Sequence, residues 1–220
     1  MERNWDMNQV SDGKRYYSND MVKLGCQECA GCSSCCHDMG NSIVLDPYDV
    51  YRLTKASGWN FQQMLEHCLE LNVVDGVILP NLKMDEEKNQ CTFLNEEGRC
   101  SIHAARPGIC RLFPLGRIYE NGGFQYFLQV HECKKENRTK MKISKWLETP
   151  QLKQYEDFVC QWHYFLKDIQ DEIKKGMEKE RIHAINVAIL NTFFIKPYHM
   201  ETDFYVQIQE RIHGFSAHNQ

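Results

Sequence analysis

Residues 26–36 read CQECAGCSSCC, which places five of the 11 cysteines of the chain in one short stretch. Four further cysteines follow along the chain, namely Cys91, Cys100, Cys110 and Cys133. Thiolates are soft ligands that bind zinc and iron strongly, and C-x-x-C spacing lets two of them reach one ion. The cysteine pattern therefore predicts a metal site built from the first 133 residues.

A disulfide framework is the alternative use of so many cysteines, and it requires an oxidising compartment. The N-terminal sequence is polar and mixed in charge, without the apolar core of a secretion signal, and no stretch approaches the length of a membrane span. The cysteines of residues 26–36 are also too crowded to pair with one another. We therefore expect metal ligation and a cytoplasmic protein with no membrane association, while the role of Cys26 stays open.

The net charge of the chain argues against a nucleic-acid partner. The sequence carries 26 Lys and Arg against 30 Asp and Glu, and no stripe of basic residues interleaved with aromatics is present. Proteins that bind nucleic acid usually show such a stripe or a strong excess of positive charge. We therefore expect no nucleic-acid binding.

The composition of the chain changes near residue 140. Ten of the 11 cysteines precede this point, and long helical periodicity follows it. The sequence predicts an α+β protein, with a small cysteine-rich metal-binding module of short β-hairpins and helices and an all-α extension at the C-terminal end. We divide it into an N-terminal segment (1–25), the metal-binding module (26–140) and a helical extension that packs on the module (141–220).

Two helices are predicted early in the module. Asp46 can cap a helix that has Pro47 at its favoured first position, and Asn60 can cap a second. In the second helix apolar residues recur at helical spacing up to Leu71, and this stripe includes Cys68. We therefore interpret Cys68 as a core residue rather than a metal ligand.

The segment QCTFLNEEGRCSIH (90–103) has the turn-prone residues of a β-hairpin at its centre. If Leu94 pairs with Arg99, Cys91 and Cys100 become diagonal neighbours on one face of the hairpin. Diagonal neighbours are close enough to share a metal. The pattern therefore predicts that these two cysteines act together.

A second hairpin is predicted over RIYENGGFQYFLQV (117–130), with its turn at residues 121–123. This hairpin delivers the chain to His131 and Cys133. Three histidines lie within three residues of a cysteine that we consider a ligand, and each of them can complete a site: His37, His103 and His131.

Helical periodicity dominates the chain after residue 144. Apolar residues three and four apart predict one long amphipathic helix: Leu152, Tyr155, Val159, Trp162, Leu166, Ile169 and Ile173. Residues 182–194 are apolar on most sides and predict a buried helix, and a third helix is expected from near Thr202. Cys160 lies beside the first stripe and is interpreted as a packing residue.

Residues 26–36 also contain the C-x2-C-x2-C-x3-C spacing of bacterial ferredoxins. His37 stands where ferredoxins have proline, and the second cysteine run of those proteins is absent, so a ferredoxin proper is not expected. Cys35 is left over from this pattern. Because adjacent cysteines tend to point in different directions, Cys35 and Cys36 can serve two different metal centres.

Three groups of residues carry a family resemblance: Cys29, Cys32, Cys35 and Cys36; then Cys91 with Gly98-Arg99-Cys100; then Arg106-Pro107 with Cys110-Arg111 and Phe113-Pro114. In this order and spacing they resemble the YkgJ-type cysteine-cluster family (CxxCxxCC), described as a zinc- or iron-chelating domain, in its long form with C-terminal helices. The resemblance implies metal ligation by Cys29, Cys32, Cys35, Cys36, Cys91, Cys100, Cys110 and Cys133. Cys26 departs from the family pattern.

Two arginines bracket the last of the motif cysteines. A guanidinium near thiolates can neutralise their negative charge or donate hydrogen bonds to sulfur, so Arg106 and Arg111 are candidates to support the metal site. The alternative is that each forms an ordinary surface salt bridge.

The identity of the metal is open between zinc, mononuclear iron and an iron-sulfur cluster. A structural zinc site has one ion with closed tetrahedral thiolate coordination, whereas a [4Fe-4S] cluster is a multi-iron group held by four cysteines. We favour the [4Fe-4S] cluster because of the ferredoxin-like spacing and because the motifs are similar to those of flagellin lysine N-methylases, relatives with a comparable cluster.

Whether the chain catalyses a reaction is not decided by its motifs. No phosphate-binding loop, dinucleotide fingerprint, nucleophile elbow or zinc-protease motif is found. Three functions stay open: a metal-binding module with a structural, sensing or redox role, a metal-dependent enzyme such as a lysine N-methylase acting on a protein substrate, and a metal store or carrier. The sequence does not indicate a protein partner or an oligomeric state.

Overall fold

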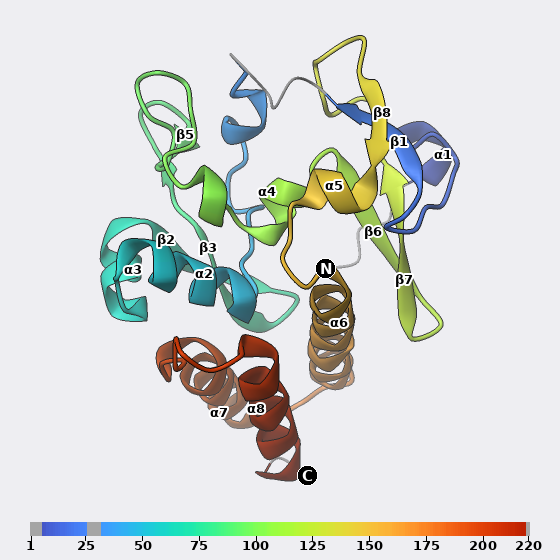
Figure 1. The fold of residues 1–220 in the computed structure, drawn as a ribbon. Helices are drawn as coiled ribbons and strands as arrows, with labels where there is room; N and C mark the ends of the chain where they lie inside the picture. Colours follow the sequence, from blue (N-terminus) through green and yellow to red (C-terminus); the bar gives the residue numbers. More distant parts are fainter. Residues whose placement is uncertain (1–5, 26–31, 219–220) are drawn as a thin grey trace.

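The computed structural model describes residues 6–25 and 32–218 of the chain. Its elements confirm the α+β class, because short helices and small β-hairpins alternate in the first part and helices follow (Figure 1). Three helices form the lower part of the molecule in that view: α6 (Leu152–Lys174), α7 (Lys179–Ile189) and α8 (Phe204–His218). Within the described residues, no helix combines the length and the apolar character needed to span a bilayer.

The strands of the described chain pair as four separate two-stranded antiparallel sheets. The pairs are β1 (Met21–Gly25) with β8 (Thr139–Lys142), β2 (Leu69–Val74) with β3 (Val77–Leu82), β4 (Met84–Asp85) with β5 (Gln90–Cys91), and β6 (Leu115–Glu120) with β7 (Gly123–Leu128). A two-stranded ribbon is marginally stable alone in water. These ribbons therefore depend on the helices and loops that pack against them.

Short helical segments connect the ribbons and place the cysteines. They are α1 (Met7–Val10), the 3-10 turn η2 (Ser34–Cys36), α2 (Pro47–Ser57), α3 (Phe61–His67), the 3-10 turn η3 (His103–Ala105), α4 (Gly108–Leu112), α5 (Ile143–Leu147) and the π-helical segment η4 (Leu190–Ile195).

The predicted starts of α2 and α3 are confirmed. The Asp46 side chain accepts a hydrogen bond from the Asp49 amide (2.9 Å), and the Asp49 side chain accepts one from the Asp46 amide (3.2 Å), so the two carboxylates form a reciprocal capping box. Asn60 caps α3 in the same way. Gly58 ends α2 in the left-handed conformation with φ of 74°.

The predicted end of the second helix is wrong. α3 ends at His67, Cys68 caps it, and the chain then enters β2, where Leu71 is 41% exposed rather than buried. The cause is the two-residue hairpin turn of Asp75 and Gly76, whose φ angles of 51° and 90° suit the primed turns that join twisted strands. Cys68 itself is 3% exposed and packs in the core, as predicted.

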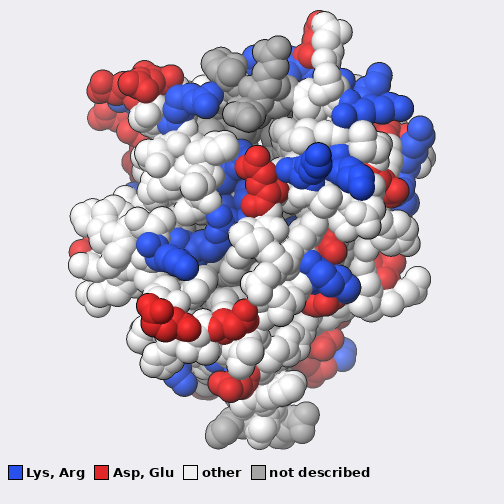
Figure 2. Space-filling view, viewed as in Figure 1, with Lys and Arg blue, Asp and Glu red and all other residues white. Residues whose placement is uncertain are grey.

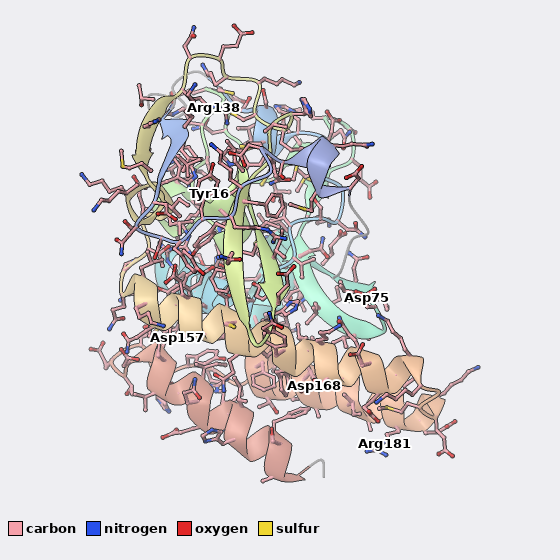
Figure 3. The ribbon with its side chains drawn as sticks, turned by 90° about the vertical axis from the view of Figure 1, so that its right-hand side faces the viewer. Tyr16, Asp75, Arg138, Asp157, Asp168 and Arg181 are labelled. Carbon is pink, nitrogen blue, oxygen red and sulfur yellow. The ribbon has the colours of Figure 1, made fainter. Side chains whose placement is uncertain are left out.

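The predicted hairpin over residues 117–130 is confirmed as β6 and β7. Asn121 and Gly122 form its turn with positive φ angles of 53° and 75°. This turn lies against α6, because the Gly122 amide donates to the Tyr164 hydroxyl (3.1 Å) and that hydroxyl donates to the Gly123 carbonyl (3.1 Å). Figure 3 shows the hairpin in front of α6, the helix that carries the labelled Asp157 and Asp168.

The apolar stripe of the long helix is confirmed, because Tyr155, Val159, Trp162 and Leu166 are all buried. They belong to a large hydrophobic cluster that also contains core residues of the segment between residues 43 and 91, and of α8. The prediction that residues 182–194 are buried on most sides is wrong in part, since Val187 on α7 is 43% exposed.

A smaller hydrophobic cluster joins the two ends of the cysteine-rich part. Its buried members are Val22, Leu24, Leu112, Leu115, Tyr126, Leu128, Ile143 and Leu147. β1 pairs with β8, so the segment before residue 26 and the segment that leads into α5 lie side by side at this cluster (Figure 1). The Trp146 indole donates to the Phe113 carbonyl (3.0 Å) and ties α5 to the chain after α4.

Candidate metal centre

Every cysteine that the structure describes is a free thiol. The described cysteines that we consider as ligands come from five places: Cys32, Cys35 and Cys36 around η2, Cys91 on β5, Cys100 after a turn, Cys110 on α4 and Cys133 in the connection between β7 and β8. Cys26 and Cys29 lie outside the described residues. A disulfide framework therefore receives no support from the described cysteines.

The η2 turn brings Cys35 and Cys36 next to each other. The hydrogen bond that the Cys35 thiol donates to the Cys36 sulfur, and after it burial, raises the pKa of Cys35. The prediction that these adjacent side chains diverge is therefore wrong. The 3-10 turn, closed by the hydrogen bond from the Cys36 amide to the Ser33 carbonyl (2.8 Å), curls the backbone tightly enough for both thiols to meet.

The chain that follows η2 runs alongside the chain that enters β5. His37 pairs with Gln90, and the Asp38 amide donates to the Asn89 carbonyl (3.0 Å). Cys91, the residue after Gln90, is thereby carried toward η2. Pairing of two segments far apart in the sequence thus brings the first cysteine run to the later cysteines.

The register predicted for residues 90–103 is wrong by one residue, because Leu94 lies opposite Cys100 and not opposite Arg99. The Asn95 side chain occupies the turn and accepts from the Arg99 amide (2.8 Å), while the Asn95 amide donates to the Arg99 carbonyl (2.9 Å). β5 pairs with β4 instead of with residues 99–103. The predicted proximity of Cys91 and Cys100 holds nonetheless, since the charge of the Cys100 thiolate raises the pKa of Cys91.

Four thiols act on one another electrostatically, and we call them the thiol cluster: Cys35, Cys91, Cys100 and Cys110. Burial raises the pKa of Cys110, and the charges of Asp49 and of the other three thiols raise it further. Burial is also the largest cause of the raised pKa of Cys91 and of Cys100, and the charge of Cys35 adds to both. Four separate parts of the chain therefore converge on this cluster.

Backbone amides support two of these sulfur atoms. A hydrogen bond from the Phe93 amide lowers the pKa of Cys91, and one from the Ile102 amide lowers the pKa of Cys100. Each amide lies two residues after its cysteine. Such N–H groups favour the thiolate, the form that binds metal. Our sequence analysis did not single out these amides, although the repeated spacing C-T-F and C-S-I was a usable signal.

The two candidate arginines lie in different surroundings. The positive charge of Arg106 lowers the pKa of Cys35 and of Cys100, so its guanidinium lies beside the thiol cluster. Arg111 is 2% exposed and its guanidinium carbon lies 5.9 Å from the centre of the Tyr48 ring and 5.3 Å from that of Tyr155. Only Arg106 therefore has the position expected of a group that offsets thiolate charge.

The remaining candidates are less closely joined to the cluster. The Cys32 thiol contacts the Ser34 hydroxyl (3.6 Å), and the His37 imidazole lies 3.4 Å from the Ser33 hydroxyl. In residues 6–25 and 32–218, no three His, Cys, Asp or Glu side chains are arranged with the geometry of a bound metal ion.

The donor chemistry of the thiol cluster nevertheless suits zinc or iron. Cysteine thiolates are the common ligands of structural zinc and of iron-sulfur clusters, and neighbouring N–H groups and cations are the usual support of such sulfurs. Cys35, Cys91, Cys100 and Cys110 would hold the metal, with Arg106 offsetting part of the charge. The bound metal would supply cross-linking of these segments and, if it is iron, electron transfer.

Comparison with known proteins gives one match. The family model "CxxCxxCC: Putative zinc- or iron-chelating domain" matches residues 28–142 of the chain. This range contains every cysteine that we consider as a ligand. No curated protein and no solved structure matches the chain.

Proposed function

The chain belongs to the CxxCxxCC family of zinc- or iron-chelating domains, and from this premise we propose that it binds a [4Fe-4S] cluster through the thiol cluster. The observation that carries the proposal is the convergence of Cys35, Cys91, Cys100 and Cys110, which are far apart in the sequence. Four cysteine ligands are the usual complement of such a cluster.

The amides and Arg106 support the same conclusion. A [4Fe-4S] cluster held by four thiolates carries net negative charge, and hydrogen bonds to sulfur together with a nearby cation lower the cost of burying it. The Phe93 and Ile102 amides and the Arg106 guanidinium supply these interactions. Cys29, Cys32, Cys36 and Cys133 are proposed as ligands of a second metal or as replacements within the first.

The proposed role of the metal is structural, with redox activity or sensing dependent on the metal that is bound. Thiolate zinc sites give apparent binding free energies of about 10–16 kcal/mol, comparable to the about 5–15 kcal/mol that stabilise a whole domain. Because the turns, the strand and the helix that carry these cysteines are short, the metal would hold them in place. Free thiols persist in reducing compartments, which supports a cytoplasmic location.

The test is elemental analysis and absorbance spectroscopy on the full chain, purified without oxygen. The proposal expects brown protein with broad absorbance at the blue end of the visible range, and stoichiometric iron with sulfide. Colourless protein with stoichiometric zinc would reject the iron-sulfur cluster and keep the thiolate site. Protein without either metal after reconstitution with iron, sulfide or zinc would reject both.

A further inference from the structure

The ribbon of β2 and β3 has one covered edge and one open edge. The covered edge belongs to β3, and three hydrogen bonds join it to other parts of the chain: the Leu45 amide donates to the Pro80 carbonyl (2.8 Å), the Leu82 amide donates to the Ile43 carbonyl (3.0 Å), and the Ile78 amide donates to the Asn186 side chain (2.6 Å). The segment before α2 and the helix α7 therefore cover β3 from outside.

The same hydrogen bonds show in which direction the backbone groups of β2 point. Opposite residues in an antiparallel ribbon alternate between pairs that bond to each other and pairs whose N–H and C=O groups point outward. Since Pro80 and Ile78 use outward groups, their partners Leu71 and Val73 also point theirs outward, on the side away from β3. In the described part of the chain, these groups of Leu71 and Val73 have no hydrogen-bond partner.

The open edge of β2 is apolar and accessible. Val73 is 69% exposed and Leu71 is 41% exposed, and their side chains lie on one face of the strand. Proteins commonly protect an edge strand with Lys, Pro or a bulge. The sequence of β2, LELNVV, contains neither Lys nor Pro, and its pairing with β3 is continuous. Figure 3 shows this ribbon, which ends at the labelled Asp75, at the border of the molecule.

The charge of β2 favours an apolar partner strand. Charged side chains of both signs lie over the face that Figure 2 shows, but Glu70 is the one charged residue of β2. Its carboxylate already accepts hydrogen bonds from the side chains of Asn72 (3.1 Å) and Asn81 (2.9 Å) within the ribbon. A strand with an excess of charge would find no complementary group at this edge. An apolar strand with an open edge of its own fits better, and β2 of a second copy is such a strand.

We propose that two copies of the chain associate by antiparallel pairing of β2 with β2, about a two-fold axis at Asn72. Leu71 of one copy then lies opposite Val73 of the second copy, and each such pair exchanges two hydrogen bonds through the outward N–H and C=O groups. The apolar side chains of both pairs meet on one face of the sheet. The two ribbons become one continuous sheet, and the pairing does not depend on the metal.

Electrostatic repulsion does not oppose this register. Glu70 lies opposite Val74 of the second copy, so the two Glu70 residues are four positions apart along the paired strands. This spacing corresponds to about 14 Å, which is longer than the Debye length of about 8 Å at physiological salt. The like charges of the two copies are therefore screened from each other.

The experiment is sedimentation velocity of the purified full chain from about 1 μM to about 1 mM, a range in which small interfaces dissociate. The chain should change from monomer to dimer as its concentration increases. Val73→Lys places two ammonium groups at diagonal positions about 7–8 Å apart in the pairing, so this variant should stay monomeric over the whole range. Val206→Lys is the matched control, since Val206 is 54% exposed on α8, and it should dimerise like the parent chain.

Amide hydrogen exchange of the unaltered chain tests the same pairing without a variant that must fold. The amides of Leu71 and Val73 should exchange at least about tenfold more slowly at dimer than at monomer concentration, because pairing protects them. The Asn72 amide points toward β3 and should be protected at both concentrations.

Three results would overturn the proposal. A chain that stays monomeric at about 1 mM would overturn it in favour of a strand from a different protein at this edge. Dimerisation of Val73→Lys with the affinity of the parent chain would place the interface elsewhere. A dimer in which the Leu71 and Val73 amides exchange as quickly as in the monomer would exclude pairing through β2.

Discussion

Replacing Cys100 by serine tests the thiol cluster directly. Cys100 contributes one of four thiols, and thiolate zinc sites give about 10–16 kcal/mol in total, so losing one of four ligands should cost about 3 kcal/mol. For a chain of this size, 1 kcal/mol corresponds to about 2–4 °C in melting temperature. We therefore expect the metal-loaded melting temperature to fall by about 6–12 °C and the metal content to fall with it.

The assay is thermal unfolding together with elemental analysis of the same samples. Cys160→Ser is the matched control, because this thiol lies on α6 and contacts the Gly122 carbonyl (3.3 Å) away from the thiol cluster. Cys68→Ser is a more demanding control, since it places a hydroxyl in the core and should lose stability but keep metal. Equal metal content in Cys100→Ser and Cys160→Ser would refute the assignment of Cys100 as a ligand.

Four further predictions concern the support of the site and the protonation of its thiols. Asp49→Ala leaves the buried Gly108 amide without its acceptor and removes the N3 half of the capping box at the start of α2, so the free energy of unfolding should fall by about 2–4 kcal/mol in a denaturant titration. A loss below about 1 kcal/mol would contradict this contact. Trp162→Ala removes a buried side chain of α6 and should lower the free energy of unfolding by about 3–5 kcal/mol in the same titration. The folded variant should keep its full metal content. Loss of metal from the folded variant would instead show that α6 shapes the site. Burial and neighbouring thiols raise the pKa values of the thiol cluster, so its cysteines are protonated before metal binds. Metal binding must displace these thiol protons, and the affinity for metal should therefore increase with pH in titrations between about pH 6 and pH 8. The stability of the metal-free protein should fall as pH rises. The thiol pKa values are higher in the folded chain than in the unfolded chain, where they are about 8.5, so the protonated thiols stabilise the fold below that pH and this stabilisation is lost above it. A melting temperature that increases above about pH 8.5 would contradict the burial of these thiols.

Local signals allowed much of the secondary structure to be predicted. The capped start of α2 at Asp46 and Pro47, and the turn at Asn121 and Gly122, depend on a few neighbouring residues whose side chains satisfy the backbone or allow positive φ. The stripe on α6 was equally readable, because a long helix repeats one pattern many times. Such features need no information about distant parts of the chain.

The errors arose where a long-range contact or a side chain altered the local pattern. Leu71 fits a helical stripe, but pairing with β3 through the Asp75–Gly76 turn makes it part of a strand. Asn95 bonds across its own turn and shifts the pairing by one residue, which periodicity alone does not reveal. The convergence of the thiols depends on the pairing of His37 with Gln90, a contact with no local signal.

The surroundings of Arg111 and Arg117 illustrate the same limit. In the sequence, Arg111 stands next to Cys110, so proximity suggested a role near sulfur. The short helix α4 turns consecutive side chains in different directions, and Arg111 contacts Tyr48 and Tyr155 instead. Arg117 lies on a strand among aromatic rings, where hydropathy patterns would place an apolar residue.

The pairing of β1 with β8 has a consequence for anyone who shortens this protein. The family match begins at residue 28, yet Val22 and Leu24 lie before it, on the strand that pairs with β8, and both are buried in the smaller hydrophobic cluster. A fragment cut at the limits of that match would leave β8 as an open edge and uncover apolar surface, two features that promote aggregation. An independently stable fragment should therefore begin before Met21.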